Sequence, residues 1–141
     1  MSIEYRSGLL SFELSPIIHC VSADLAMGAG FAAQVPDEHK RLARMWNPDK
    51  HVNWLPPGLL IRTETKTGSV IFHAVTKEKC WHKPTFDDFK TAISEIEEHE
   101  LSEVFCPKIG SGLDMLPWDR VESFLKTLKT HFVVFDGKRI Q

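Results

Sequence analysis

The sequence predicts an α/β protein of the three-layer α/β/α type, in which a mixed central sheet lies between two layers of helices. Apolar runs of strand length alternate along the chain with segments whose apolar residues repeat at helical spacing. Two strand-like runs are joined by a short turn that contains Gly68, so this pair is expected to be antiparallel and the sheet mixed. The length of 141 residues suits one domain with a substantial core, and we expect residues 1–141 to form it.

The first third of the chain is expected to contribute two strands and two helices. Ile3–Arg6 is a short strand-like run, and Leu9–Leu14 either extends it or forms a turn on the core. Ile17–Val21 is an apolar run with the length of a buried strand. A first helix follows and ends at Pro36, which lacks the N–H that continues a helix, and a second helix is expected over Asp37–Trp46.

The middle of the chain is expected to form a long loop and a β-hairpin. Asn47–Gly58 holds three prolines and shows no apolar periodicity, which predicts a surface loop. Its His51 and Trp54 either line a cleft or cover the core. Leu59–Thr65 and Val70–Thr76 are the two strands of the predicted hairpin.

The last third begins with a helix whose start is marked by a capping box. The side chain of Thr85 is placed to accept a hydrogen bond from the backbone three residues later, at Asp88, and an apolar stripe continues to about Glu100. The remaining expected elements are the strand Glu103–Pro107, a helix that begins near Pro117, and the strand His131–Phe135.

The composition is that of an ordinary globular protein, with 43% hydrophobic and 26% charged residues. A net charge of −2 and a pI near 6.4 give no electrostatic footprint for duplex nucleic acid, so backbone amides would have to hold an anionic ligand. The sequence shows no apolar run long enough to span a bilayer and no signal-peptide pattern. We expect an intracellular monomer, cytoplasmic or, in a eukaryote, nuclear.

The three cysteines, Cys20, Cys80 and Cys106, are widely spaced and form no disulfide framework, which is typical of reduced thiols in an intracellular protein. Cys80 and His82 form a close pair of metal-ligand residue types, but the sequence offers no second Cys or His pair at ligand spacing to complete a site. We therefore expect no metal site and no cofactor.

The stretch Ile17–Gln34 predicts a strand, a small-residue loop and the start of a helix. Gly28 and Gly30 permit positive φ angles and let another molecule approach the backbone closely. The N–H groups of such a loop, and of the helix that follows, offer a place for phosphate. Junctions of this kind also occur for tight packing alone, and the loop by itself leaves both interpretations open. His19 and Cys20, inside the strand, are expected to pack in the core.

Three polar segments follow directly after expected strands: Ala23–Gly30, Lys77–Lys83 and Lys108–Asp114. Ligands of open α/β sheets bind outside the carboxyl ends of the strands, so parallel strands would bring these segments to one edge. Two glycine loops would then face each other across a cleft, an arrangement that suits a diphosphate better than a single phosphate. Lys77 and Asp114 would lie beside it.

Four sequence motifs together resemble those of a known family. His19–Asp24 leads to Met27-Gly28-Ala29-Gly30, and Pro107–Asp114 forms the second glycine loop. With Thr76-Lys77 and the run His82-Lys83-Pro84-Thr85, they resemble the macro domain and, within that superfamily, the terminal ADP-ribose protein glycohydrolase group. The resemblance covers nearly the full chain in order.

This resemblance implies a mixed sheet between helices and a cleft for ADP-ribose, free or attached to protein or nucleic acid. In the glycohydrolase group, a lysine after the central strand attacks the anomeric carbon of the distal ribose, and an aspartate that closes the second loop acts as acid and base. By position in the motifs these residues are Lys77 and Asp114. The positions implied to bind the ligand are Leu10, Ser22, Asp24, Met27, Gly28, Ala29, Gly30, Phe31, Pro107, Ile109, Gly110, Ser111, Gly112 and Leu113.

The chemistry of glycosyl cleavage agrees with these two roles. Breaking a bond at an anomeric carbon builds oxocarbenium-like charge, which a carboxylate stabilises while it moves a proton. A lysine becomes a nucleophile only after it loses its proton, which desolvation or neighbouring cations such as Lys79 and Lys83 promote. The plainer alternatives are a solvated surface lysine, an Asp114 that caps a helix, and an Asp24 that only braces its loop.

One departure from the family pattern concerns the base of the ligand. Many macro domains carry Gly-Asp and an apolar residue near the first strand, with the aspartate reaching the adenine amino group, whereas this chain has Gly8-Leu9-Leu10. The carboxylate is missing there, Leu10 is left to contact the ring, and Asp136, beyond the family's usual end, is the candidate replacement. Ala23 and Ser111 are milder differences.

Three functions fit this resemblance. We favour an enzyme that removes ADP-ribose from acidic side chains or nucleobases through a transient bond to Lys77. The first alternative is an ADP-ribose 1″-phosphate phosphatase, which would activate a water at phosphorus. The second is a module that binds ADP-ribose without chemistry, against which the presence of both Lys77 and Asp114 argues.

Overall fold

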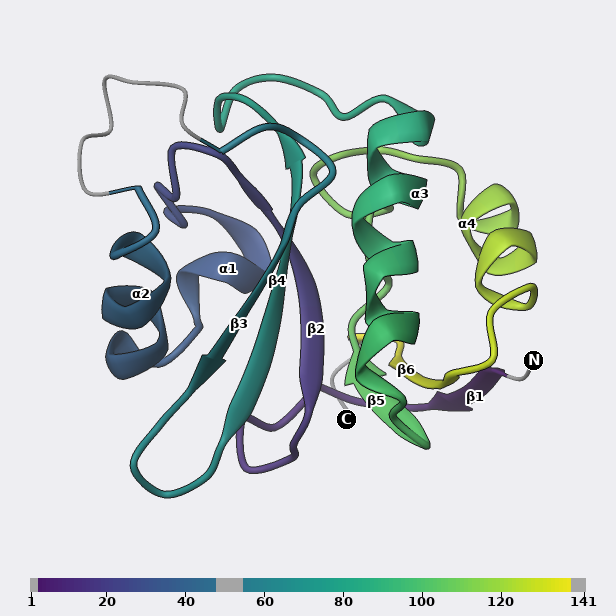
Figure 1. The fold of residues 1–141 in the computed structure, drawn as a ribbon. Coiled ribbons are helices and arrows are strands. Elements are labelled where there is room, and N and C mark those ends of the chain that lie inside the picture. Colours follow the sequence, from purple (N-terminus) through teal and green to yellow (C-terminus); the bar gives the residue numbers. More distant parts are fainter. Residues whose placement is uncertain (1–2, 48–54, 138–141) are drawn as a thin grey trace.

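The computed structural model describes residues 3–47 and 55–137, which form a mixed sheet of six strands with helices on both faces (Figure 1). The strands are β1 (Ile3–Arg6), β2 (Ile17–Ser22), β3 (Leu60–Glu64), β4 (Val70–Lys77), β5 (Glu103–Cys106) and β6 (His131–Phe135). The helices are α1 (Gly30–Ala33), α2 (Asp37–Arg44), α3 (Phe86–Ser94), the 3₁₀ helix η1 (Glu95–His99) and α4 (Trp118–Leu125). The predicted three-layer α/β/α architecture is confirmed. His51 and Trp54 of the predicted loop lie outside the described residues.

The strand order is β1-β6-β5-β2-β4-β3, and only β3 runs antiparallel to its neighbour within this sheet of the described chain. The predicted hairpin is confirmed: β3 pairs with β4, and the N–H of Gly68 (φ 88°) donates to the carbonyl of Thr65 at 3.0 Å in the turn. The carboxyl ends of β1, β6, β5, β2 and β4 therefore share one edge of the sheet, whereas β3 presents its amino end there.

Alternation along β2 divides the core between the two faces of the sheet. Ile18 packs in the cluster beneath α3 and α4, while Ile17 and Val21 pack in the cluster beneath α1 and α2 (Figure 1). A strand with apolar residues on both faces is what a sheet covered on both sides requires. Within residues 3–47 and 55–137, no helix has the length and apolar character needed to cross a membrane.

At the N-terminal end of the chain, the structure decides between two alternatives for one segment and moves the end of one helix. Of the two alternatives for Leu9–Leu14, the turn is confirmed: the chain leaves β1 before Gly8 (φ 104°), and the segment does not lengthen that strand. Helix α2 ends at Arg44, two residues before the predicted end, because the N–H groups of Met45 and Trp46 bond to carbonyls three residues back and tighten the last turn.

The predicted cap of the third helix is confirmed. The backbone N–H of Asp88 donates to Thr85 Oγ1 at 3.0 Å. The α-helix itself ends at Ser94, and the predicted remainder is η1, which closes at Glu100 in the left-handed conformation (φ 51°).

Three histidines form a buried polar chain across the sheet. His19 Nε2 lies 2.7 Å from His73 Nδ1, and Thr63 Oγ1 lies 2.8 Å from His73 Nε2 and 2.7 Å from His39 Nδ1. His39 Nε2 continues the chain to Ser69 Oγ at 3.0 Å. Burial lowers the pKa of all three imidazoles, to about 3 for His19. The core therefore holds these histidines neutral, and His19 lies there as predicted.

Candidate active site

The three polar segments meet at the carboxyl edge of the sheet, as predicted. They follow β2, β4 and β5, which are neighbours in the order β5-β2-β4. The N–H of Ala23 donates to the carbonyl of Lys77 at 2.8 Å, and the N–H of Asp24 donates to that of Glu78 at 3.3 Å. The first glycine loop and the segment after β4 are thus hydrogen-bonded side by side.

The two glycine loops also touch each other. A methyl group added to Gly30 would lie 3.0 Å from Leu113 Cδ1, so the Leu113 side chain rests against the backbone of the first loop. Leu113 is nonetheless 62% exposed, so most of its side-chain surface lies outside this contact. Loops 80 residues apart in the sequence therefore share one site.

The first loop leads directly into helix α1, as predicted, but this helix is short. Helix α1 has only four residues before the chain turns at Pro36, so its macrodipole is small. The available donors are instead the N–H groups of the loop around Gly28 and Gly30. Leu25 (φ 53°) and Met27 (φ 49°) adopt left-handed conformations, which non-glycine residues enter only at a cost in energy.

The Asp24 carboxylate holds the first loop in shape. It accepts hydrogen bonds from the Ser22 hydroxyl and from the backbone N–H groups of Ala26 and Cys80, the latter two at 3.2 Å. Partial burial disfavours its charge, but these hydrogen bonds outweigh that effect and keep the pKa of Asp24 below its usual value. This geometry fits the structural alternative considered for Asp24 in the sequence analysis, in which its carboxylate braces the first loop, here against the segment after β4.

Helix α2 clamps the same loop from outside. Arg44 Nε donates to the carbonyl of Leu25 at 3.1 Å, and Nη2 donates to that of Ala26 at 2.9 Å. Asn47 Nδ2 donates to the carbonyl of Ala23 at 2.9 Å. Sequence reasoning missed Arg44 and Asn47, because their partners lie 18 to 24 residues away and neither residue belongs to a motif.

Replacing Arg44 with alanine is expected to lower the free energy of unfolding by about 1–3 kcal/mol, because two partly buried carbonyl groups lose a charged donor. Urea denaturation at constant pH measures the change. Arg41→Ala, at an exposed arginine of the same helix, is the matched control and should stay within about 0.5 kcal/mol of wild type. Equal effects of the two substitutions would contradict a clamping role for Arg44.

Lys77 and Asp114 form an ion pair at the junction of these segments. Lys77 Nζ lies 2.6 Å from Asp114 Oδ1, and the two side chains are only 13% and 14% exposed. Lys77 is the last residue of β4 and pairs in register with Ser22, which places its side chain beside the first loop. A charged pair shielded in this way is held more firmly than an exposed one.

Cys20 is the other nucleophilic side chain near this pair. Burial raises the pKa of its thiol above the usual range, and the charge of Asp114 adds to that shift. A thiol needs to be ionised to act as a nucleophile. Lys77 is therefore the better candidate of the two.

The second glycine loop folds back on itself. Leu116 N–H donates to the carbonyl of Gly110 at 2.7 Å, and the Ser111 hydroxyl donates to the carbonyl of Leu116 at 2.5 Å. At its tip, Lys83 Nζ donates to the carbonyl of Leu113 at 2.5 Å. Gly110 (φ 76°) is enclosed: an added methyl group would lie 2.9 Å from Leu116 and from Phe89.

Gly110→Ala is expected to lower the free energy of unfolding by about 2–5 kcal/mol, because it combines a left-handed backbone with overpacking. Gly112→Ala is the control, since a methyl group there meets no atom within 4 Å. Differential scanning calorimetry of the two variants checks the contrast. A Gly110→Ala protein as stable as Gly112→Ala would show that the loop is not packed as described.

The remaining predicted ligand-binding residues fall into two groups. Ser22, Ile109 and the glycines lie at the shared edge, while the Leu10 and Met27 side chains are largely buried in the core. Phe31 packs against Phe12, with ring centroids 5.0 Å apart. Leu10 follows β1, so it lies at the same edge but on the far side of β5 and β6. Their contacts with a ligand stay predictions.

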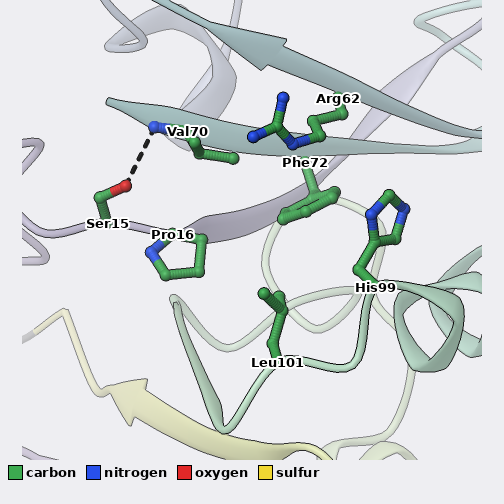
Figure 2. Close-up of a pocket in the computed structure, with 7 residues that line it drawn as sticks. All are labelled: Ser15, Pro16, Arg62, Val70, Phe72, His99 and Leu101. Carbon is green, nitrogen blue, oxygen red and sulfur yellow. Dashed lines mark hydrogen bonds between the residues drawn. The ribbon is translucent and has the colours of Figure 1, made fainter. Parts of the chain in front are cut away.

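A small pocket lies at the opposite edge of the sheet (Figure 2). It is lined by Ser15, Pro16, Arg62, Val70, Phe72, His99 and Leu101, and its volume is about 250 Å³. Pro16 precedes β2 and Val70 begins β4, so the pocket sits at the amino ends of the parallel strands. It is smaller than typical ligand pockets and distant from the ion pair. Among the described residues, no group of three or more His, Cys, Asp or Glu is arranged to hold a metal ion.

Comparison with known proteins agrees with this architecture. No protein-family model matches the chain. It is 26% identical over 118 residues to ADP-ribose glycohydrolase OARD1 of Bos taurus, across 81% of this chain and 74% of that protein. The macrodomain of Mycobacterium tuberculosis DarG superposes with a TM-score of 0.74 at 20% identity, over 94% of this chain and 96% of that one. Thermosipho africanus DarTG in complex with ADP-ribose superposes with a TM-score of 0.67 at 16% identity, over 89% of this chain and 39% of that one.

These likenesses identify the fold as that of a macro domain. Within this class the chain resembles the terminal ADP-ribose glycohydrolases, as its paired glycine loops predicted.

Proposed function

We propose that this protein is an ADP-ribosyl hydrolase that removes ADP-ribose from modified acidic side chains or nucleobases. The observation that carries the proposal is the shielded Lys77–Asp114 pair, 2.6 Å apart, where the two glycine loops meet. The similarity to ADP-ribose glycohydrolase OARD1 and the solved DarTG complex with ADP-ribose support this choice of ligand.

The two glycine loops would bind the diphosphate. Gly28 and Gly30 in one loop and Gly112 in the other are exposed and carry backbone N–H groups without bulky side chains, which lets phosphate oxygens approach the main chain. A net charge of −2 means that local donors, not the overall field, must provide the attraction. With the diphosphate at the loops, the distal ribose would lie against Lys77 and Asp114.

Each of these two residues would take a distinct part in the reaction. Asp114 accepts a proton from the Lys77 ammonium group, and the free amine then attacks the anomeric carbon of the distal ribose. The bond to the leaving group breaks with its electron pair, and Asp114 passes the proton to that group. A water molecule, deprotonated by Asp114, displaces Lys77 from the sugar and releases ADP-ribose. The 2.6 Å contact provides the direct path for the first proton transfer.

Product analysis tests this proposal. The protein is incubated separately with ADP-ribosylated protein, ADP-ribosylated nucleic acid and ADP-ribose 1″-phosphate, and the products are identified by chromatography. Release of free ADP-ribose from either macromolecule is the expected result. Release of inorganic phosphate alone would indicate a phosphatase, and tight binding of ADP-ribose with no product would indicate a binding module.

A further inference from the structure

The pocket at the amino ends of the parallel strands has apolar walls that suit a flat ring (Figure 2). These walls come from three segments: Pro16 precedes β2, Val70 and Phe72 lie on β4, and Leu101 precedes β5. The Phe72 side chain is buried, and the imidazole of His99 meets its ring edge-on, with ring centroids 4.6 Å apart. Aromatic rings pack favourably in such edge-on and offset arrangements. The apolar side of the pocket therefore favours an aromatic ligand.

The polar groups of the same pocket are suited to a negative charge. Arg62 and His99 line it, and none of its lining residues is an aspartate or a glutamate. Arg62 Nη2 donates to Glu64 Oε1 at 2.9 Å, which uses one N–H of the guanidinium and leaves the others for a ligand. Ser15 Oγ accepts the backbone N–H of Val70 at 3.0 Å, and its hydroxyl proton can donate to a ligand. A carboxylate would therefore find a charged donor and a hydroxyl here.

The volume of the pocket limits the size of its ligand. A cavity of about 150 Å³ can hold benzene, and this pocket has a volume of about 250 Å³, which suffices for one ring with a small substituent. We propose that it binds a monocyclic aromatic carboxylate, with the ring against Phe72 and Leu101 and the carboxylate toward Arg62. A planar carboxylate can accept two parallel hydrogen bonds from one guanidinium, which makes arginine a selective partner for it. This second site is independent of the reaction proposed at Lys77.

NMR titration of the isotope-labelled protein with benzoate tests the proposal. The amide signals of Val70, Phe72 and Leu101 should shift together and saturate, with a dissociation constant in the millimolar range expected for so small a ligand. Benzamide has nearly the same shape without the charge and should bind roughly tenfold more weakly. Acetate has the charge without the ring and should not saturate these signals. Equal affinities for benzoate and benzamide, or no saturable shift at these residues, would overturn the proposal.

Two substitutions on β3 should change benzoate binding in opposite directions. Arg62→Gln removes the guanidinium and should weaken benzoate binding about tenfold while leaving benzamide binding unchanged. Glu64→Gln removes the competing acceptor and should strengthen benzoate binding, which a purely structural Arg62 would not cause. Arg41→Gln removes an exposed cation of α2 and should have no effect. Equal losses in Arg62→Gln and Arg41→Gln, or benzoate shifts confined to the glycine loops, would contradict a carboxylate site at this edge.

Discussion

Lys77→Ala is expected to stop the release of ADP-ribose from a modified target, with a loss of at least about a thousandfold in kcat, and to leave ADP-ribose affinity nearly unchanged. The amine contributes a covalent step, which cannot be replaced by a methyl group. The loops that would hold the diphosphate are built by other residues, chiefly Asp24 and Arg44. Single-turnover hydrolysis and calorimetric titration of the same preparation measure the two effects.

The controls for this prediction separate the amine from general effects of charge. Lys129→Ala removes an exposed lysine just before β6, at the opposite edge, and should hydrolyse substrate at the wild-type rate. Asp114→Ala should also lose most of its activity, because no carboxylate is then in place to protonate the leaving group and deprotonate the water. Undiminished turnover in Lys77→Ala would reject the lysine mechanism and leave the fold assignment intact.

Acidification is expected to destabilise the protein well before its carboxylates are neutralised. His19 and His73 have pKa values below that of a free histidine, about 3 for His19, because burial disfavours the imidazolium. The unfolded chain therefore binds more protons than the native protein as the pH falls below about 6.5. The contribution of these neutral histidines to the free energy of unfolding is fully present above about pH 6.5 and is lost progressively toward pH 3. Each of these histidines contributes a slope of about 1.4 kcal/mol per pH unit, so His19 alone accounts for about 3 kcal/mol at pH 4.

Urea denaturation at half-unit steps between pH 7 and pH 5 emphasises the histidine contribution, because the reference pKa of histidine, about 6.5, lies within that range and those of Asp and Glu, about 3.9 and 4.3, lie below it. His19→Gln should flatten the dependence of unfolding free energy on pH, whatever its effect at pH 7. His82→Gln, at an exposed histidine, should leave the slope of wild type unchanged. A wild-type free energy that is constant from pH 7 to pH 5 would mean that the buried imidazoles accept protons without penalty.

Local sequence patterns predicted the framework because each depends on near neighbours. The β3–β4 hairpin follows from two strand-like runs around a glycine turn, and the start of α3 follows from Thr85 and Asp88. The pairing of Lys77 with Asp114 could be anticipated because Lys77 ends one parallel strand, Asp114 lies in the loop after another, and both belong to motifs of one family. Such features need no knowledge of distant contacts.

Features that depend on contacts between distant elements were not predictable in this way. The histidine chain joins β2, β3, β4 and α2, and no spacing along the sequence relates His39 to His73. The clamp of Arg44 on the first loop depends on how α2 packs over it. The early end of α1 at Ala33 could not be predicted either, because the apolar spacing in the sequence continues to Val35, beyond the hydrogen-bonded helix.

The contact between Leu113 and Gly30 has a consequence for the kinetics of ligand capture. If the diphosphate binds between the two glycine loops as proposed, the contact between Leu113 and Gly30 lies in its way, and the tip of the second loop would have to move for the ligand to bind. That movement competes with the hydrogen bond from Lys83 that holds the tip. The association rate constant would then be set by opening of the loop and would be lower than the diffusional encounter rate.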